Sequence, residues 1–234
     1  MFIVKTKKEI MGLALILFIG ITSGVIINIS PIKGVFSINK NIKTIIIDAE
    51  HGLPDGGTTG NAGTVEQEIN LQIAKKTEEV LNGKGYRIIM TRTSNESLAM
   101  DENSTIRKMK IEDMKKRKEL IKKSGADLFI SIHMNSYPNE KVSGLRFFYS
   151  EKHPKTLQLA EQIQNEIGKI TGAKTYAVKT ADKDLFLMKN IPVPAILAEC
   201  GFLSNPEEEQ KLKNKEYQSK IAWAIAKAID DYYN

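Results

Sequence analysis

Histidine is scarce in this chain, and two of the three histidines lie where metal-binding or catalytic residues are often found. The three are His51, His133 and His153. His51 follows the segment TIIIDAE, and His133 ends the segment DLFISIH. Imidazole is the commonest metal ligand in proteins near neutral pH. Two imidazoles after two apolar runs therefore suggest a metal site, although a lone histidine after a strand is more often a hydrogen-bonded structural residue.

Glu66 is a candidate for the third ligand of such a site. Catalytic zinc is usually held by three protein ligands, and its fourth position stays open for water. Glu66 opens a predicted helix after a glycine-rich loop, so its carboxylate could point back toward the strand ends. The alternative is a first-turn acid that only stabilises the helix dipole. Glu68 competes for the role but lies on another side of the helix.

Glu199 is a second acid of interest because it follows the apolar run PAILA. A carboxylate in an apolar strand is costly unless it is paired, metal-bound or functional. Beside a divalent metal it could act as a general base and then donate its proton to a leaving amine. An ion pair with a buried arginine is the structural alternative.

The next residue, Cys200, is the single cysteine, so an internal disulfide is excluded and a small buried side chain is expected.

The scaffold that would position these residues can be predicted from the alternation of apolar and amphipathic segments. Strands are expected at 43–49, 86–92, 126–133, 144–150 and 193–201, and helices at 66–82, 101–123, 154–170, 206–214 and 216–233. This order predicts one α/β domain over residues 42–234, with a mainly parallel twisted sheet and helices on both faces. Ligands gather beyond the carboxyl ends of such strands. His51, Arg92, His133 and Glu199 all fall at those ends.

The N-terminal residues 1–30 predict export. Three lysines within the first ten residues precede the uncharged segment from Met11 to Ile29. That segment is about as long as the 20 residues that a helix needs to cross the hydrocarbon core. Basic residues before it place the N-terminus in the cytoplasm and the remainder outside. We expect a retained signal-anchor rather than a cleaved signal peptide, followed by a linker at 31–41.

The net charge of +6 comes from lysines scattered through the predicted helices. A solvated basic surface is the simpler interpretation, and attraction to an anionic polymer such as cell wall or nucleic acid is the alternative. Nucleic-acid binding is not expected, because the sequence has no known module and no interleaving of aromatic and basic residues.

Five ordered blocks resemble the zinc-dependent N-acetylmuramoyl-L-alanine amidases. They are IIIDAEHG, VEQEINLQIA, IMTR, ADLFISIHMNS and ILAECGFLSNPEE, and the resemblance covers residues 43–232. It implies that His51, Glu66 and His133 bind one Zn²⁺ ion and that Glu199 is the catalytic acid and base. The reaction implied is hydrolysis of the amide bond between N-acetylmuramic acid and L-alanine in peptidoglycan. The partner implied is therefore the peptidoglycan glycan strand.

Other residues of these blocks receive less specific roles from the resemblance. Arg92 is expected to shape the site or pair with the substrate, and Asn70 and Asn135 are candidate substrate-binding or site-shaping residues. Arg117 matches a family arginine and is expected to be structural.

Glu50 departs from the pattern, since the family carries glycine there. If that position needs a positive φ, Glu50 would strain the turn by about 1–2 kcal/mol and would add negative charge beside the metal.

The likeness is closest to the CwlD-type amidases of spore-cortex peptidoglycan. The short chain, the N-terminal hydrophobic segment and the PDGGTTG loop resemble that subgroup. It implies a germination role, in which stem removal is the first step toward muramic-δ-lactam in the forespore or cortex space. An activating protein partner is left open. Two alternatives also stay open: a non-catalytic peptidoglycan-binding homologue, which Glu50 would favour, and a zinc carboxypeptidase that trims the peptide stem.

Overall fold

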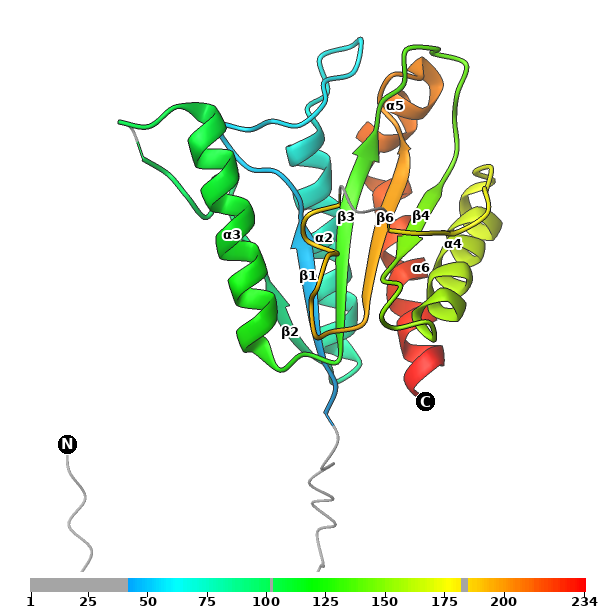
Figure 1. The fold of residues 1–234 in the computed structure, drawn as a ribbon. Coiled ribbons are helices and arrows are strands. Elements are labelled where there is room, and N and C mark those ends of the chain that lie inside the picture. The colour runs from blue at the N-terminus through cyan, green and yellow to red at the C-terminus, as the bar shows by residue number, and fades with distance from the viewer. Residues whose placement is uncertain (1–41, 102, 182–184) are drawn as a thin grey trace, which may run out of the picture. The chain divides into compact units, whose positions relative to one another are not determined.

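A six-stranded, mostly parallel sheet forms the centre of the part of the chain that the structure describes (Figure 1). The computed structural model describes residues 42–101, 103–181 and 185–234. The strands, in the spatial order β2–β1–β3–β6–β4–β5, are β1 (Thr44–Ala49), β2 (Arg87–Met90), β3 (Leu128–Asn135), β4 (Arg146–Tyr149), β5 (Lys179–Thr180) and β6 (Ala195–Phe202). β1, β2, β3 and β6 are mutually parallel, whereas β4 runs antiparallel to β6 and parallel to β5. The predicted α/β architecture with a mainly parallel sheet is confirmed.

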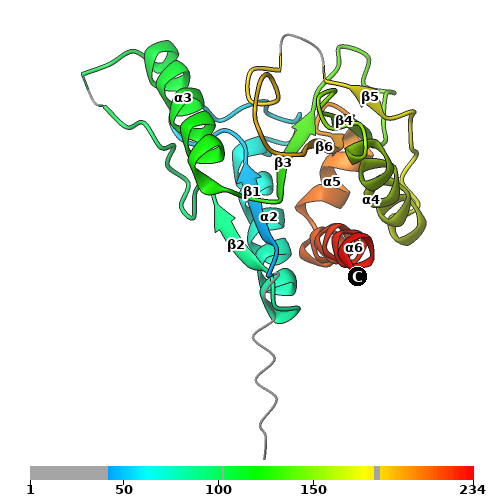
Figure 2. The ribbon, with the colours of Figure 1, turned by 60° about the horizontal axis from the view of Figure 1, so that its bottom comes forward.

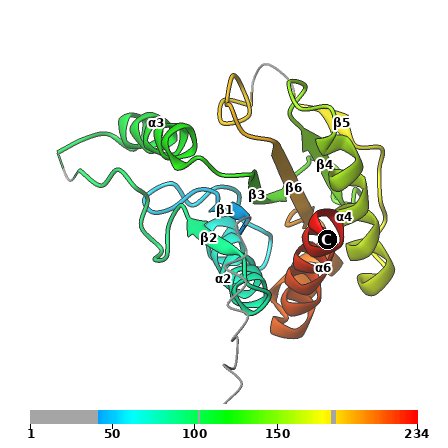
Figure 3. The ribbon, with the colours of Figure 1, turned by 90° about the horizontal axis from the view of Figure 1, so that it is seen from below.

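Helices cover both faces of this sheet, as the sequence predicts (Figures 2 and 3). They are α2 (Glu66–Gly83), α3 (Ile106–Ser124), α4 (Thr156–Thr171), α5 (Pro206–Lys213) and α6 (Lys215–Tyr233). α2, α4 and α6 pack together on one face and bury the larger core cluster. α3 lies on the opposite face, where it covers a smaller cluster with the segment 185–193.

Burial on both faces explains the continuous apolar runs in the sequence. Successive side chains of a strand point to opposite faces. Ile45 and Ile47 of β1 therefore join the larger cluster, whereas Ile46 joins the cluster under α3. A parallel sheet that is covered on both sides removes all three from water, which favours β-branched residues at every position.

The helix on the α3 face begins later than the sequence predicts. We expected it to start at Asp101, but it starts at Ile106. The Thr105 hydroxyl accepts a hydrogen bond from the Lys108 N–H, which satisfies a free donor of the first turn. The helix ends at Gly125, whose φ of 62° allows the left-handed turn that terminates it.

The predicted signal-anchor at 1–30 and the linker at 31–41 lie outside the described residues. Within the ranges that the structure describes, no helix combines the length and the apolar character needed to span a membrane.

Candidate metal centre

The carboxyl ends of three neighbouring parallel strands bring the candidate residues to one edge of the sheet. His133 lies on β3 directly opposite Glu199 on β6. Residues two or four positions apart on a strand point to the same face, so His133 shares a face with Phe129, and Glu199 shares one with Leu197. Phe129 and Leu197 are buried under α3. Strand alternation therefore directs His133 and Glu199 toward the α3 side of the sheet.

Two histidines and Glu66 come together there. The distance from His51 Nε2 to Glu66 Oε2 is 3.2 Å, and that from His133 Nδ1 to Glu66 Oε1 is 3.4 Å. Glu50 joins the group, and one ligand atom from each of the four residues lies within 4.8 Å of all the others. Metal–ligand bonds of about 2.0–2.1 Å place tetrahedral ligands about 3.3 Å apart. The spacing of these side chains therefore suits a shared ion.

Glu66 is fixed by hydrogen bonds from three segments. Its Oε2 accepts the Thr58 N–H at 2.9 Å, and its Oε1 accepts the Met134 N–H at 3.1 Å and the Asn70 amide at 3.4 Å. The carboxylate thus reaches the strand ends instead of serving only the helix dipole. Glu68 is exposed on another side of α2.

His51 is oriented by a carboxylate that the sequence analysis does not single out. Its Nδ1 lies 2.9 Å from Asp55 Oδ2, which Lys110 Nζ also approaches at 2.9 Å. Such an outer carboxylate fixes the orientation of a metal-binding imidazole and leaves its other nitrogen free to coordinate. The only sequence signal for Asp55 was its place in the PDGG loop, four residues after His51.

Gly57 of the same loop lies against the candidate ligands. Its φ is +72°, and a Cβ there would lie 2.5 Å from Glu66 Oε2 and 2.7 Å from His51 Nε2. Only glycine fits both the backbone angle and the close approach. The PDGG loop is therefore part of the wall of the site.

Arg92 and Asn70 contact protein groups rather than the open side of the site. Arg92 is 4% exposed and donates to the carbonyl oxygens of Ala49, Glu50, Ser94 and Gln67. Asn70 is fully buried and donates to the Glu50 carbonyl and to Glu66. Of the two roles considered for Arg92, the geometry favours shaping the site over pairing with substrate.

Asn135 lies at the end of β3 and is partly exposed. Its Oδ1 accepts the Ser136 N–H at 2.7 Å, and its carbonyl accepts the Leu203 N–H at 2.8 Å. The strand pairing shifts register between His133 and Asn135, so the simple alternation of faces does not carry over from one to the other.

A buried ion pair supports the strand end from below. Arg117 Nη1 lies 2.5 Å from Asp48 Oδ1, Arg117 Nε lies 2.7 Å from Asp113 Oδ2, and Arg117 Nη2 donates to the His51 carbonyl. Burial opposes the charge of Asp48, but Arg117 and hydrogen bonds from Ser131 and another buried hydroxyl keep its pKa below the usual value. These contacts give Arg117 a structural role.

Carboxylates around the two imidazoles make this a strong site for positive charge. Burial disfavours the charged rings, yet hydrogen bonds to Asp55, Glu50 and Glu66 raise the pKa of His51 to about 12. Burial also disfavours the charged ring of His133, but the charge of Glu50 and the hydrogen bond to Glu66 raise its pKa to about 9. A divalent cation would satisfy the same field, and the imidazole and carboxylate donors are of the type that binds zinc. The residues present therefore fit a metal ion.

Glu199 has the properties of a proton-transfer group. Its Oε2 is buried and has no hydrogen-bond partner within the described residues. Burial raises the pKa of Glu199 to about 7; the charge of His133 opposes the shift, and those of Glu66 and Glu50 add to it. A carboxyl with a pKa near the working pH can both accept and donate a proton.

The strain considered for Glu50 is absent. The non-glycine residues with positive φ in the described ranges are His51, at 60°, and Asn190, at 56°. The left-handed conformation thus falls on His51, one residue after the position where the family pattern has glycine. The Glu50 side chain points into the site, where its Oε2 lies 2.6 Å from His51 Nε2.

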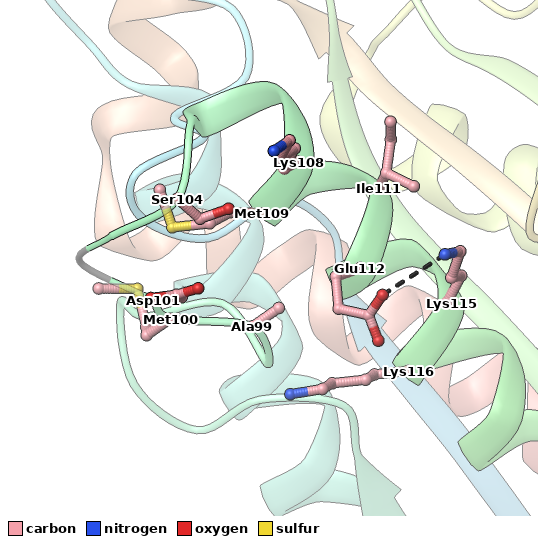
Figure 4. A pocket seen from close by; sticks show the side chains of 10 residues that line it. All are labelled: Ala99, Met100, Asp101, Ser104, Lys108, Met109, Ile111, Glu112, Lys115 and Lys116. Atoms are coloured by element: carbon pink, nitrogen blue, oxygen red, sulfur yellow. Dashed lines mark hydrogen bonds and ion pairs between the residues drawn. The ribbon is translucent and has the colours of Figure 1, made fainter.

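A small cavity adjoins the cluster on the α3 side. It has a volume of about 140 Å³ and is lined by Glu50, Ser131 and His133 together with Met114, Phe129, Leu197 and the residues 185–188. A larger groove of about 510 Å³ lies between α3 and the residues Ala99, Met100, Asp101 and Ser104 (Figure 4). That groove carries the Glu112–Lys115 ion pair, at 3.5 Å, and contains none of the candidate ligands.

An α/β sheet whose strand ends gather two imidazoles and several buried carboxylates is typical of metal-dependent hydrolases. The sequence matches the N-acetylmuramoyl-L-alanine amidases over residues 45–231. The chain therefore belongs to the N-acetylmuramoyl-L-alanine amidase family, whose enzymes act on the bond between N-acetylmuramic acid and L-alanine in peptidoglycan. The family resemblance of the sequence is confirmed.

A germination-specific amidase and two solved clostridial amidases are among the similar proteins. The chain is 37% identical over 191 residues to the germination-specific N-acetylmuramoyl-L-alanine amidase of Bacillus subtilis (strain 168), with 82% of this chain and 80% of that protein covered. The CwlD amidase of Clostridioides difficile, solved in complex with the GerS lipoprotein, superposes with a TM-score of 0.78 at 39% identity, covering 82% of this chain and 98% of that one. An N-acetylmuramoyl-L-alanine amidase from Clostridium difficile 630 superposes with a TM-score of 0.72 at 30% identity. The match covers 82% of this chain and 97% of that one.

Proposed function

We propose that this enzyme is a zinc-dependent amidase in which His51, Glu66 and His133 hold the metal and Glu199 transfers the proton. The observation that carries the proposal is the convergence of these side chains at one edge of the sheet. The ligand atoms of both histidines and Glu66 lie within 4.8 Å of one another, and Glu199 stands opposite His133 on the adjoining strand.

The difficult steps of the reaction are attack on a weakly electrophilic amide carbonyl and protonation of the leaving nitrogen. When bound, a zinc ion polarises the carbonyl and makes water a better nucleophile near neutral pH. Glu199 accepts a proton from the attacking water as the new carbon–oxygen bond forms. It then delivers that proton to the nitrogen of L-alanine as the carbon–nitrogen bond breaks, which restores the carboxylate. A buried Oε2 without a competing partner is free for both transfers.

The neighbouring residues position this machinery. Asp55 holds His51 Nδ1, and Asn70 holds Glu66 Oε1. Arg92 fixes the carbonyls of Ala49 and Glu50 at the strand end. We assign Asn135 to the substrate side, because it is partly exposed at the rim next to the ligand strand.

A spore-cortex role is the finer part of the proposal. Support comes from the germination-specific relative of Bacillus subtilis and from the CwlD structure. The enzyme would remove peptide stems as the first step toward muramic-δ-lactam, outside the cytoplasmic membrane in the forespore or cortex space. Residues 1–30 would export it and keep it anchored. Because the CwlD amidase was solved with a lipoprotein, we extend the proposal to an activating protein partner of that kind.

Digestion of purified peptidoglycan followed by mass spectrometry tests the reaction. The amidase is expected to release whole stems that begin with L-alanine, whereas a carboxypeptidase would release only terminal residues. A non-catalytic wall-binding protein would release nothing. Elemental analysis of the same preparation is expected to find about one zinc per chain, and release of terminal residues alone would overturn the proposed reaction.

A further inference from the structure

Glu50 carries a buried carboxylate that the proposed three-ligand site does not use. The residue is 5% exposed, and its Oε2 is buried. That atom lies 2.6 Å from His51 Nε2 and 3.8 Å from His133 Nδ1. Within the described residues, no lysine or arginine lies within ion-pair distance of it. Of the described basic groups, only the two imidazoles face this buried carboxylate, and a buried charge is costly unless it is paired or bound to metal, so the position suits a metal cation.

The backbone holds this carboxylate in place. The Glu50 carbonyl accepts hydrogen bonds from Arg92 Nη2 at 3.1 Å and from Asn70 Nδ2 at 3.2 Å. The Glu50 N–H donates to the Ile132 carbonyl on the adjoining strand. The Glu50 backbone is thus tied to Arg92 after β2, to α2 and to β3, and its side chain lies against the two histidines.

The orientation of His51 also favours a metal ion that Glu50 shares. Because its Nδ1 faces Asp55, Nε2 is the ring nitrogen that faces Glu50 and remains available to a metal ion. His51 Nε2 and Glu50 Oε2 are 2.6 Å apart, so one cation can lie against both atoms. If an ion takes Nε2, the same ion is within reach of Glu50.

We infer that Glu50 is a fourth protein ligand of the metal, beside His51, Glu66 and His133. The inference rests on the proposed function. Four protein ligands close a zinc site that three would leave open. Glu50 would therefore raise metal affinity and compete with water, the substrate carbonyl and small anions for the fourth position.

The test compares Glu50→Gln and Glu50→Gly with the wild-type full chain, using Zn²⁺ and Co²⁺ as probes. Glutamine keeps the size of the side chain, and glycine is the family residue at this position. Glu199→Gln is the matched control, since it removes one negative charge from the same site without removing a proposed ligand. Zinc affinity is measured by competition with a chromophoric chelator, and circular dichroism checks the fold.

We expect both Glu50 variants to lose at least about tenfold in zinc affinity, and Glu199→Gln to stay within about threefold of wild type. The visible spectrum of the Co²⁺-loaded wild type should change little when azide is added, whereas that of Co²⁺-loaded Glu50→Gly should shift. Wild-type zinc affinity in Glu50→Gln, or equal azide responses in all the proteins, would overturn the fourth ligand. Retention of zinc by His133→Ala would instead overturn the proposed site itself, so the two failures are distinguishable.

Discussion

His133 and Glu199 are direct neighbours across the parallel pair β3–β6. Adjacent strands are about 4.8 Å apart, so a proposed metal ligand and the proposed proton carrier are set side by side by the sheet itself. No loop has to close to bring them together. Because Glu199 is not a proposed metal ligand, its substitution should affect activity alone, whereas substitution of His133 should affect metal binding as well.

Replacing Glu199 with glutamine should abolish hydrolysis while the fold and the metal are retained. The amide is nearly isosteric with the carboxyl but cannot carry the proton, so we expect the turnover number to fall by at least about a hundredfold. Release of stems from peptidoglycan gives the rate, and elemental analysis gives the zinc content.

The adjacent Cys200 supplies the control for this substitution. It is buried, and burial raises the pKa of its thiol, so it is not expected to act as a nucleophile. Cys200→Ala should retain most of the activity, with a modest loss of stability. Near-normal turnover by Glu199→Gln would remove Glu199 from the proposed role.

The sequence predicted the parts of this site that depend on strands. Apolar runs located β3 and β6, and the rule that parallel strands share a carboxyl edge placed His133 and Glu199 at the same edge of the sheet; their direct pairing is seen only in the structure. Loop residues were harder to predict, because the contacts of Asp55 and Gly57 depend on φ angles and not on periodicity. Helix α3 started late for a similar reason, since the cap at Thr105 outweighed the charged residues before it.

Replacing His133 with alanine should remove the metal as well as the activity. Its Nδ1 lies 3.4 Å from Glu66 Oε1, and the loss of a metal ligand lowers zinc affinity by far more than the tenfold typical of an outer-shell change. Zinc content after dialysis is the measurement.

His153→Ala is the matched histidine control. His153 lies before α4, away from the strand-end cluster, and its carbonyl accepts the Thr156 N–H. This variant should keep its zinc. Equal zinc contents in the two alanine variants would refute the ligand assignment of His133.

Alanine at Gly57 should damage the metal site through contact rather than through backbone strain alone. The new methyl group would lie 2.5 Å from Glu66 Oε2 and 2.7 Å from His51 Nε2, so these side chains must move. We expect zinc affinity to fall at least about tenfold.

Gly63→Ala separates contact from strain. Gly63 has a φ of +79°, close to the +72° of Gly57, but a Cβ at Gly63 would meet nothing within 4 Å. Both variants should lose about 1 kcal/mol of stability from the left-handed backbone. Only Gly57→Ala should lose metal, and comparable zinc affinities in both would argue against the close approach of this loop.

The buried Asp48–Arg117 pair predicts a loss of stability in acid. The pKa of Asp48 lies below its value in the unfolded chain, so the unfolded state binds more protons as the pH falls. The contribution of Asp48 is fully present above its unfolded pKa of about 3.9 and is lost as the pH drops through the lower folded value. Urea unfolding from pH 7 to pH 3 measures it.

Asp48→Asn should cost about 3–5 kcal/mol at pH 7, because Arg117 stays buried with one carboxylate partner fewer. Its free energy of unfolding should then fall less steeply below pH 4 than that of the wild type, since the titrating group is gone. Glu112→Gln, which breaks the exposed pair with Lys115, should leave both the stability and its pH slope nearly unchanged. Parallel pH curves for Asp48→Asn and the wild type would show that another carboxylate sets the acid limit of the fold.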